Sequence, residues 1–332
     1  MVRIAVVGAG NMGRNHMRVL GQLGDRAVVT AVVDPLASRG LRLDVPASGV
    51  LITPRLEDAL AVSDALVVAA PSRLHHAIAM QCLRAGKDVL VEKPLATDVA
   101  DARELAATAR RLGRVLQVGH IERFNPAVRQ VQAILQGEDV IAAEAHRLSY
   151  FTPPAAYDNL VVDLMIHDLD IVLALFHGAS LHRVTAVASP WGAANGYLHV
   201  QALLEFADGR SGSFTVSRLA HEKVRTLKLY SRERTVTLDY LTREVRVSRL
   251  GSASALSDGV HGYRVETHNE YLVASGEPLY FELAHFVDCV RQRCEPEVSG
   301  EDGVAALEAS MRILAACSGA EAWDSVAVAA DH

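Results

Sequence analysis

Two separate stretches of this sequence together carry the residue types that can take a proton from a hydroxyl group. Asp163 and His167 lie four positions apart in an otherwise apolar stretch, 160–176, and Lys93 stands in an isolated Glu-Lys-Pro triplet. In a helix, the carboxylate and the imidazole would project from one face, about 6 Å apart along the axis. With a lysine from elsewhere, such a pair can remove the hydroxyl proton while a cofactor takes the hydride from the same carbon. The spacing therefore predicts an enzyme that oxidises an alcohol.

A purely structural role for these polar residues is the competing interpretation. Asp168 and Asp170 could be helix caps or exposed charges, and a lysine at a strand end, taken alone, is more often a surface residue. However, an acid or a histidine in so apolar a helix is costly unless it faces a cleft or has a partner. We therefore favour catalytic roles for Asp163 and His167.

The chain opens with a glycine pattern that is typical of dinucleotide binding. Gly8, Gly10 and Gly13 follow an apolar run directly and precede a helical pattern. The first glycine permits a tight turn, the second lets the backbone approach a pyrophosphate, and the third allows helix and strand to pack closely. Because the free N–H groups of the helix N-terminus would face the phosphates, Asn11 and Met12 are also expected at the cofactor.

Asp34 indicates which dinucleotide is bound. It closes the second expected strand, about 20 residues beyond the glycine pattern, where an acid accepts hydrogen bonds from the adenosine ribose and repels a 2′-phosphate. Arg39 could instead reach a 2′-phosphate. On balance we predict NAD as the cofactor.

Residues 1–118 alternate short apolar runs with helical patterns. The expected strands are Arg3–Val7, Val28–Val33, Ala65–Ala69, Asp88–Val91 and Val115–Val118, and the expected helices include Asn15–Leu23, His75–Ala85 and Val99–Leu112. Buried strands joined by helices predict a parallel sheet with right-handed crossovers. Glu92 and Lys93 directly follow one strand, at the edge where open α/β sheets bind ligands. We expect this part to be the NAD-binding domain.

The pattern changes after Gly119. A polar segment leads into a short helix, a strand over Val140–Tyr150 and the helix that carries Asp163. The strands expected next are Arg183–Ser189, Leu198–Phe206, Ser211–Val216, Arg225–Tyr230, Thr235–Asp239 and Glu244–Ser248. Their short connections favour an antiparallel sheet. We expect a loop over Gly251–Gly262 and two final helices, Leu279–Cys294 and Gly303–Ala322.

Composition and charge argue against several other classes of protein. The 332 residues, 50% hydrophobic and 22% charged with a net charge of −6, are typical of a soluble protein with two domains. No basic run is interleaved with aromatic residues, so we expect no nucleic-acid partner. The four cysteines show no metal-ligand spacing, which predicts reduced thiols in the cytoplasm and no metal site. No apolar stretch approaches the length that spans a bilayer, so we expect no membrane association.

Motifs along nearly the whole chain resemble those of the Gfo/Idh/MocA family of NAD(P)-dependent sugar and cyclitol dehydrogenases. They are the glycine pattern, Ala-Pro71-Ser-Arg-Leu-His75, Ala-Gly86-Lys-Asp-Val-Leu-Val-Glu92-Lys93-Pro94, Asp163-Leu-x-x-His167-Asp-x-Asp170, Phe286-Val-Asp-Cys-Val and Val298-Ser-Gly-Glu-Asp-Gly303. The resemblance implies an α/β fold, with an N-terminal Rossmann domain and a C-terminal α/β domain with an open, mostly antiparallel sheet. It also implies that residues 119–332 bind substrate and mediate a homo-oligomer, a dimer or a tetramer.

The same resemblance implies roles for individual residues. His167 is the general base, Lys93 polarises the hydroxyl group or relays its proton, and Asp163 completes the catalytic set. Pro71 and His75 fall where the family lines the nicotinamide nucleotide, and Glu92 is expected near the same place.

A narrower resemblance suggests a substrate. The segment Val118-Gly-His-Ile-Glu-Arg-Phe-Asn-Pro126, together with Ser149-Tyr-Phe-Thr-Pro-Pro154, is similar to the bacterial UDP-N-acetylglucosamine 3-dehydrogenases. Those enzymes oxidise the C3 hydroxyl of a nucleotide sugar, and an aminotransferase then acts on the ketone for the diamino sugars of lipid A. Arg123 and Asn125 would suit a diphosphate or an amide, although an interdomain salt bridge is an equal alternative for Arg123. His167 would also contact the sugar. Tyr150 and Tyr157 could stack on the uracil or contact the sugar, and they could equally be core or rim aromatics.

Two alternatives remain open at this point. One is NAD-dependent oxidation of another sugar, nucleotide sugar or cyclitol. The other is a regulatory protein that binds NAD without turnover. The acid–base pair argues against this second alternative, because such a protein would have no use for it beside the nicotinamide.

Overall fold

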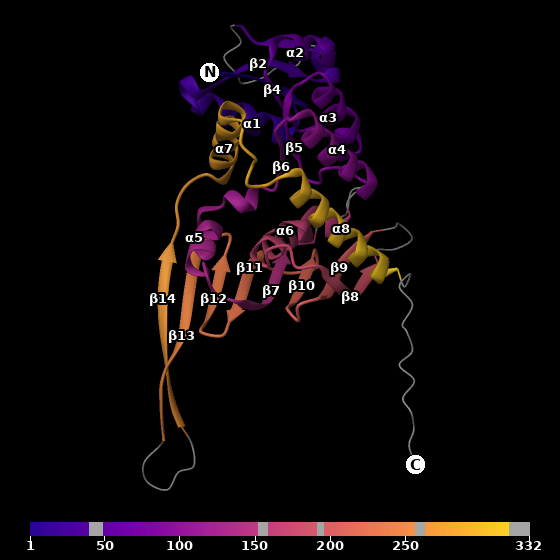
Figure 1. Cartoon of the computed structure of the whole chain (residues 1–332). Helices are drawn as coiled ribbons and strands as arrows, with labels where there is room; N and C mark the ends of the chain where they lie inside the picture. The colour runs from indigo at the N-terminus through magenta and orange to yellow at the C-terminus, as the bar shows by residue number, and fades with distance from the viewer. Residues whose placement is uncertain (40–48, 152–158, 191–195, 256–262, 319–332) are drawn as a thin grey trace.

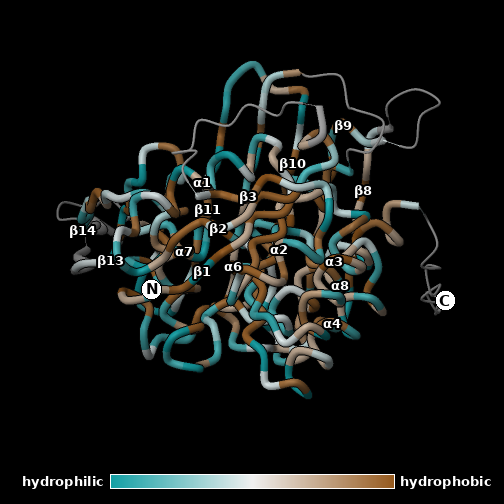
Figure 2. Tube along the Cα trace, turned by 90° about the horizontal axis from the view of Figure 1, so that it is seen from above, coloured by the Kyte–Doolittle hydropathy of each residue, from teal (hydrophilic) through white to brown (hydrophobic). Residues whose placement is uncertain are grey.

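The computed structural model describes residues 1–39, 49–151, 159–190, 196–255 and 263–318. This part of the chain forms two sheets, one in the upper and one in the lower half of Figure 1, with helices packed against each. Seen from above in Figure 2, the apolar strands of the first sheet lie in the middle of the molecule and polar segments surround them. Within the described residues, no helix is both long enough and apolar enough to cross a membrane.

The upper sheet contains only parallel strands, in the order β3-β2-β1-β4-β5-β6. These strands are β1 (Val2–Val7), β2 (Ala27–Val33), β3 (Leu51–Thr53), β4 (Ala65–Val68), β5 (Asp88–Glu92) and β6 (Leu116–Gly119). The helices that connect them are α1 (Asn11–Gln22), α2 (Leu56–Val62), α3 (His75–Arg84) and α4 (Val99–Leu112). The strand order reverses between β1 and β4, and ligands bind outside the carboxyl ends of the strands at such a point.

The lower sheet has the order β14-β13-β12-β11-β7-β10-β9-β8, and all its neighbouring strands are antiparallel except β7 and β10. The strands are β7 (Val140–Leu148), β8 (Leu181–Pro190), β9 (Tyr197–Phe206), β10 (Ser211–Ser217), β11 (Val224–Ser231), β12 (Arg234–Asp239), β13 (Glu244–Ala255) and β14 (Tyr263–Val273). The helices α5 (Pro126–Ile134), α6 (Ile166–Leu175) and α8 (Gly300–Cys317) complete this half of the molecule.

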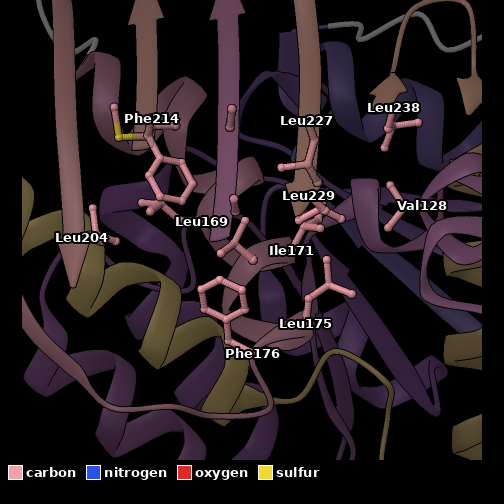
Figure 3. Close-up of a cluster of buried hydrophobic side chains, with 14 of the residues drawn as sticks. Val128, Leu169, Ile171, Leu175, Phe176, Leu204, Phe214, Leu227, Leu229 and Leu238 are labelled. Carbon is pink, nitrogen blue, oxygen red and sulfur yellow. The ribbon is translucent and has the colours of Figure 1, made fainter. Parts of the chain in front are cut away.

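One face of the lower sheet holds the larger hydrophobic core. Along β9, buried and more exposed residues alternate, as a strand with only one covered face requires. Figure 3 shows Leu169 and Phe176 of the α6 segment directed toward Phe214 and Leu229 of the sheet. This packing holds α6 against that face of the sheet and thereby positions the residues just before it.

Helix α7 (Pro278–Gln292) packs on the upper sheet, although it follows the last strand of the lower one. Its side chains Leu283 and Phe286 share a buried cluster with Ile4 and Val6 of β1. The chain therefore returns to the first domain after residue 277, which a single boundary at 118/119 does not describe.

The predicted fold class is confirmed: a Rossmann sheet is followed by a mostly antiparallel sheet. Asp98 caps α4 by accepting from the Ala100 N–H at 2.7 Å, and Gly113 ends that helix with a φ of +61°. The prediction of a loop from Gly251 was wrong for residues 251–255, which continue β13, while 256–262 lie outside the described residues.

Candidate active site

The glycine-rich turn between β1 and α1 has the shape that a dinucleotide needs. Gly8 has a φ of +97°, and a Cβ there would lie 2.6 Å from the carbonyl oxygen of Ala69. A Cβ on Gly13 would lie 1.8 Å from the carbonyl oxygen of Gly8, so no side chain fits. By contrast, a Cβ on Gly10 would meet nothing within 4 Å, which leaves room for a pyrophosphate. Because Asn11 and Met12 open α1, their N–H groups suit phosphate oxygens at this place.

Asp34 lies at the end of β2 and braces this turn. One carboxylate oxygen accepts from the Ala9 N–H at 2.8 Å and the other accepts from the Leu36 N–H at 2.8 Å. The carboxylate is therefore held beside the glycine-rich turn, where it can also accept from ribose hydroxyls. The side chain of Arg39, the alternative that would favour NADP, lies outside the described part of the chain.

Lys93 and Asp163, 70 residues apart in the sequence, meet between the two domains. The Lys93 Nζ donates to the Asp163 carbonyl oxygen at 2.7 Å and to its Oδ1 at 3.1 Å. A guanidinium nitrogen of Arg218 donates to Asp163 Oδ2 at 3.0 Å. The Asp163 carboxylate thus links a lysine of the first domain to an arginine of the second.

A cavity of about 290 Å³ opens beside this contact. Its walls come from the turn after β1, the segment after β4, the end of β5 and the segment before α6, and they consist of Met12, Ala69, Ala70, Ser72, His75, Glu92, Lys93, Pro94, Asn159, Val162 and Asp163. The structure therefore gathers expected cofactor residues and two of the three expected catalytic residues around one space.

His167 lies one turn beyond Asp163, but the two are not joined. A π-helical turn, Val161–Met165, precedes α6, and among the described residues no hydrogen bond connects the Asp163 carboxylate with the imidazole. The Asp163 carboxylate therefore does not orient the imidazole of His167, because it is bound by Lys93 and Arg218 instead. The His167 Nδ1 is buried and without a hydrogen-bond partner.

The surroundings of His167 keep its imidazole neutral. Burial lowers the pKa of His167 well below its usual value, and the positive charges of Lys93 and Arg147 lower that pKa further. A neutral imidazole at physiological pH can accept a proton, as a general base must.

His75 lines the cavity, and Pro71 lies between two of its lining residues, Ala70 and Ser72. The His75 Nδ1 lies 2.7 Å from the Pro94 carbonyl oxygen and its Nε2 lies 2.8 Å from that of Ala70. His75 therefore ties the cis Lys93–Pro94 turn to the segment after β4. The Pro71 carbonyl accepts from the Leu74 N–H at 2.8 Å and begins the short turn that leads into α3.

Glu92 belongs to a buried polar cluster beneath the cavity. Its Oε1 lies 2.7 Å from the His16 Nε2, and both oxygens of Glu282 on α7 are buried without a partner. Burial raises the pKa of Glu282 well above its usual value, and the charge of Glu92 raises it further. The ligand atoms of His16, Glu92 and Glu282 lie within 4.8 Å of one another, so these are the buried residues that could hold a metal ion in the described part of the chain.

The structure corrects the substrate roles expected for Arg123 and Asn125. Arg123 is 5% exposed, and its guanidinium donates to Asp170 at 2.8 and 3.2 Å and to Asp302 at 3.0 Å, which is the salt bridge that the sequence left open. Asn125 is 3% exposed and caps α5 by accepting from the Ala127 N–H. Both side chains are occupied by protein groups, so neither is available to a substrate.

Tyr150 follows β7 and is 59% exposed. Tyr157 lies outside the described residues.

Sequence reasoning missed Arg218, and it also missed His120, which is 1% exposed with no partner for either ring nitrogen. The available signal for His120 was its place in the polar segment that follows the expected strand Val115–Val118. Nothing in the sequence relates Arg218 to Asp163.

Two family models match consecutive parts of this chain. One describes an oxidoreductase family with an NAD-binding Rossmann fold and matches residues 2–120, and the other describes the GFO/IDH/MocA C-terminal domain and matches residues 106–237. The chain belongs to the Gfo/Idh/MocA family. As a member of this family it is an NAD-dependent oxidoreductase that acts on the CH–OH group of a sugar or cyclitol.

Relatives of this family member act on different substrates. The chain is 26% identical over 316 residues to UDP-N-acetylglucosamine 3-dehydrogenase of Acidithiobacillus ferrooxidans, covering 95% of this chain and 97% of that protein. A solved structure of that enzyme superposes with a TM-score of 0.83 over the same shares. The chain is also 33% identical over 219 residues to inositol 2-dehydrogenase of Mycolicibacterium gilvum, covering 63% of this chain and 62% of that protein. GenD2 from gentamicin A biosynthesis, solved with NAD, is 25% identical with a TM-score of 0.75 over 96% of this chain and 95% of its own.

Proposed function

We propose that this protein oxidises the C3 hydroxyl of UDP-N-acetylglucosamine to a ketone with NAD. The similarity to an enzyme of that activity extends over nearly the full length of both chains, whereas the similarity to inositol dehydrogenases covers less than two thirds. The contact between Lys93 and Asp163 supports the catalytic part of the proposal, because it joins the two domains beside a cavity that is lined by residues expected at the cofactor.

In this proposal the catalytic residues are Lys93, Asp163 and His167. The neutral imidazole of His167 accepts the hydroxyl proton, and the Lys93 ammonium donates a hydrogen bond to the oxygen as negative charge develops on it. Asp163 holds Lys93 in place through its carbonyl and its carboxylate. Bound NAD would accept the hydride that the oxidised carbon gives up. The products would be a ketone, NADH and one proton.

The cofactor-binding residues in this proposal fall into two groups. Gly8, Gly10 and Gly13 shape the pyrophosphate turn, at which Asn11 and Met12 present backbone N–H groups. Asp34 would bind the ribose, and the nicotinamide end would meet Pro71, His75, Glu92 and Lys93. On the substrate side, His167 would contact the sugar, and Tyr150 would contact it or stack on the uracil.

The partners follow from the same proposal. A 3-keto nucleotide sugar is a substrate for an aminotransferase, which would supply the nitrogen of a 2,3-diamino sugar for lipid A.

The outer face of the lower sheet exposes Val187 and Leu203 by 61% and 59%, which supports a homo-oligomer through this face. Light scattering after gel filtration should give a dimer or tetramer, and Leu203→Lys should reduce that mass. The four free cysteines are in keeping with a protein of the cytoplasm.

The oxidation of another sugar, nucleotide sugar or cyclitol is the second candidate, favoured by the local identity to inositol 2-dehydrogenases. Absorbance of NADH should be followed with NAD and UDP-N-acetylglucosamine, free N-acetylglucosamine or myo-inositol, and with NADP in place of NAD. A sugar aminotransferase with glutamate should be added to draw off the ketone. Signal with the nucleotide sugar and NAD alone is the expected result. Turnover of myo-inositol without turnover of the nucleotide sugar would replace the first candidate with the second.

A further inference from the structure

Arg225 lies on the inner face of the lower sheet, near the catalytic residues. It is the second residue of β11 and pairs directly with Arg147 of β7. Residues opposite each other in an antiparallel pair share one face of the sheet. Arg147 uses that face to donate to Asp168, on α6, at 2.8 and 3.0 Å. The Arg225 side chain therefore starts from the face that α6 covers.

Arg225 differs from its neighbours in having no anionic partner. Arg147 binds Asp168 and Glu122, and Arg218 binds Asp163. Over the described ranges of the chain, the guanidinium of Arg225 forms neither an ion pair nor a hydrogen bond, although the residue is half-buried. Two like charges in directly opposed positions of a sheet destabilise it unless an anion joins them.

The positive charge of Arg225 acts on His167, one of the proposed catalytic residues. Burial, followed by repulsion from Arg147, lowers the pKa of the Arg225 guanidinium. Arg225 in turn contributes to the lowered pKa of His167. Leu148 of β7 pairs with Ser217 of β10 on one side and with Val224 of β11 on the other, so these three residues form one row across the sheet. Arg218 and Arg225 are the residues that come next in the chain after Ser217 and Val224.

We propose that Arg225 binds the diphosphate of the nucleotide sugar. This inference rests on the proposed function, because it assigns the charged part of that substrate. C1 of the sugar, which carries the diphosphate, is two bonds from C3, so a phosphate must lie near the base that deprotonates the C3 hydroxyl. A planar guanidinium donates two parallel hydrogen bonds to phosphate oxygens. The carboxylates of Glu122, Asp168 and Asp163 act on Arg225 only through their charge, and within the described residues none of them forms an ion pair or a hydrogen bond with it.

The binding of UDP and of uridine, measured by calorimetry without any turnover, tests this role. The wild-type protein should bind UDP more tightly than uridine. Arg225→Met should weaken UDP binding by about tenfold to a hundredfold, the range expected for hydrogen bonds to a charged group, and leave uridine binding unchanged. Arg225→Lys keeps the charge but loses the planar geometry, so its affinity for UDP should lie between those of the wild type and Arg225→Met.

Arg232→Met is the matched control, since Arg232 is exposed in the turn after the same strand. Its affinity for UDP should equal that of the wild type. Equal binding of UDP by Arg225→Met and the wild type would overturn the proposal, as would wild-type protein that does not prefer UDP to uridine. If Arg225→Met does not fold, Arg225→Lys decides the matter by the same comparison. If Arg225→Met loses the preference for UDP but the wild-type protein turns over only myo-inositol, the phosphate site stands and the proposed substrate is rejected.

Discussion

Lys93 and His167 act on the same hydroxyl group in the proposed reaction, one by donating a hydrogen bond and the other by accepting a proton. Replacing either one removes an interaction made in the transition state. Lys93→Met and His167→Ala should each lower kcat by about 10²- to 10⁴-fold, while the dissociation constant of NAD, measured by calorimetry, stays nearly unchanged. Lys223→Met, which alters an exposed lysine, is the control. Full turnover in both variants would remove these residues from the mechanism.

Glu282 offers a test that depends on pH. Its carboxyl pKa is raised above the unfolded value, so ionisation of this buried group opposes folding at any pH above that value, and the cost disappears below it. Glu282→Gln should therefore stabilise the protein at pH 8 by about 1–3 kcal/mol, and the gain should vanish near pH 4. Thermal unfolding at both pH values measures this.

Glu295→Gln, at an exposed acid, is the matched control for Glu282→Gln and should have no such effect. Destabilisation by Glu282→Gln at pH 8, together with stoichiometric metal in the purified protein, would contradict this expectation. It would show instead that His16, Glu92 and Glu282 bind a cation.

Residue types predicted part of the site and misassigned another part. Lys93 and Asp163 were expected in one cleft, because a strand end and a polar position in an apolar helix each indicate a function. For Arg123, a diphosphate and an interdomain salt bridge were equal alternatives, and its partners are Asp170 and Asp302. An arginine suits a phosphate and a carboxylate equally well, and only tertiary structure decides which of the two lies beside it.

At the scale of elements, α1 contains a matched pair of glycines. A Cβ on Gly13 collides with the Gly8 carbonyl, whereas a Cβ on Gly21 meets nothing within 4 Å. Gly13→Ala should abolish measurable NAD binding, since the turn must open to admit the methyl group. Gly21→Ala should preserve NAD binding and stabilise the helix by about 0.5–1 kcal/mol. Calorimetric titration with NAD compares them. Wild-type affinity in Gly13→Ala would show that the tight turn is not required.

Most strands with a strong apolar pattern were predicted within two residues, except that Glu244–Ser248 was predicted to end seven residues before β13 does. Strands without such a pattern were missed. Val224–Ser231 and Arg234–Asp239 extend the predicted strands only slightly. Leu51–Thr53 was missed because three residues at a sheet edge, two of them exposed, give no periodic pattern. Tyr263–Val273 was missed because it is an edge strand with several polar residues, and its pairing with β13 holds it in place.

At the scale of the whole molecule, Arg123 joins segments that are far apart in the sequence. Its two carboxylate partners lie on α6 and at the start of α8, and both Arg123 and Asp170 are buried. Arg123→Met would leave a buried carboxylate without a partner, so the free energy of unfolding should fall by about 3–5 kcal/mol. Arg103→Met breaks an exposed pair with Glu308 and should cost at most about 1 kcal/mol. Denaturant unfolding compares the variants. A normal stability with weaker substrate binding in Arg123→Met would restore its role at the substrate.

The position of α7 on the first sheet has a consequence for synthesis on the ribosome. Ile4 and Val6 are covered by Leu283 and Phe286, which leave the exit tunnel only after the entire lower sheet has been made. Throughout that interval, Met17 and Leu20 of α1 are present, but the α7 side chains that complete this buried cluster are missing, so part of an apolar face of the nascent first domain stays uncovered. We expect the second domain to mature while the first is still incomplete, and chaperones that recognise exposed apolar surface to bind the nascent chain at this face.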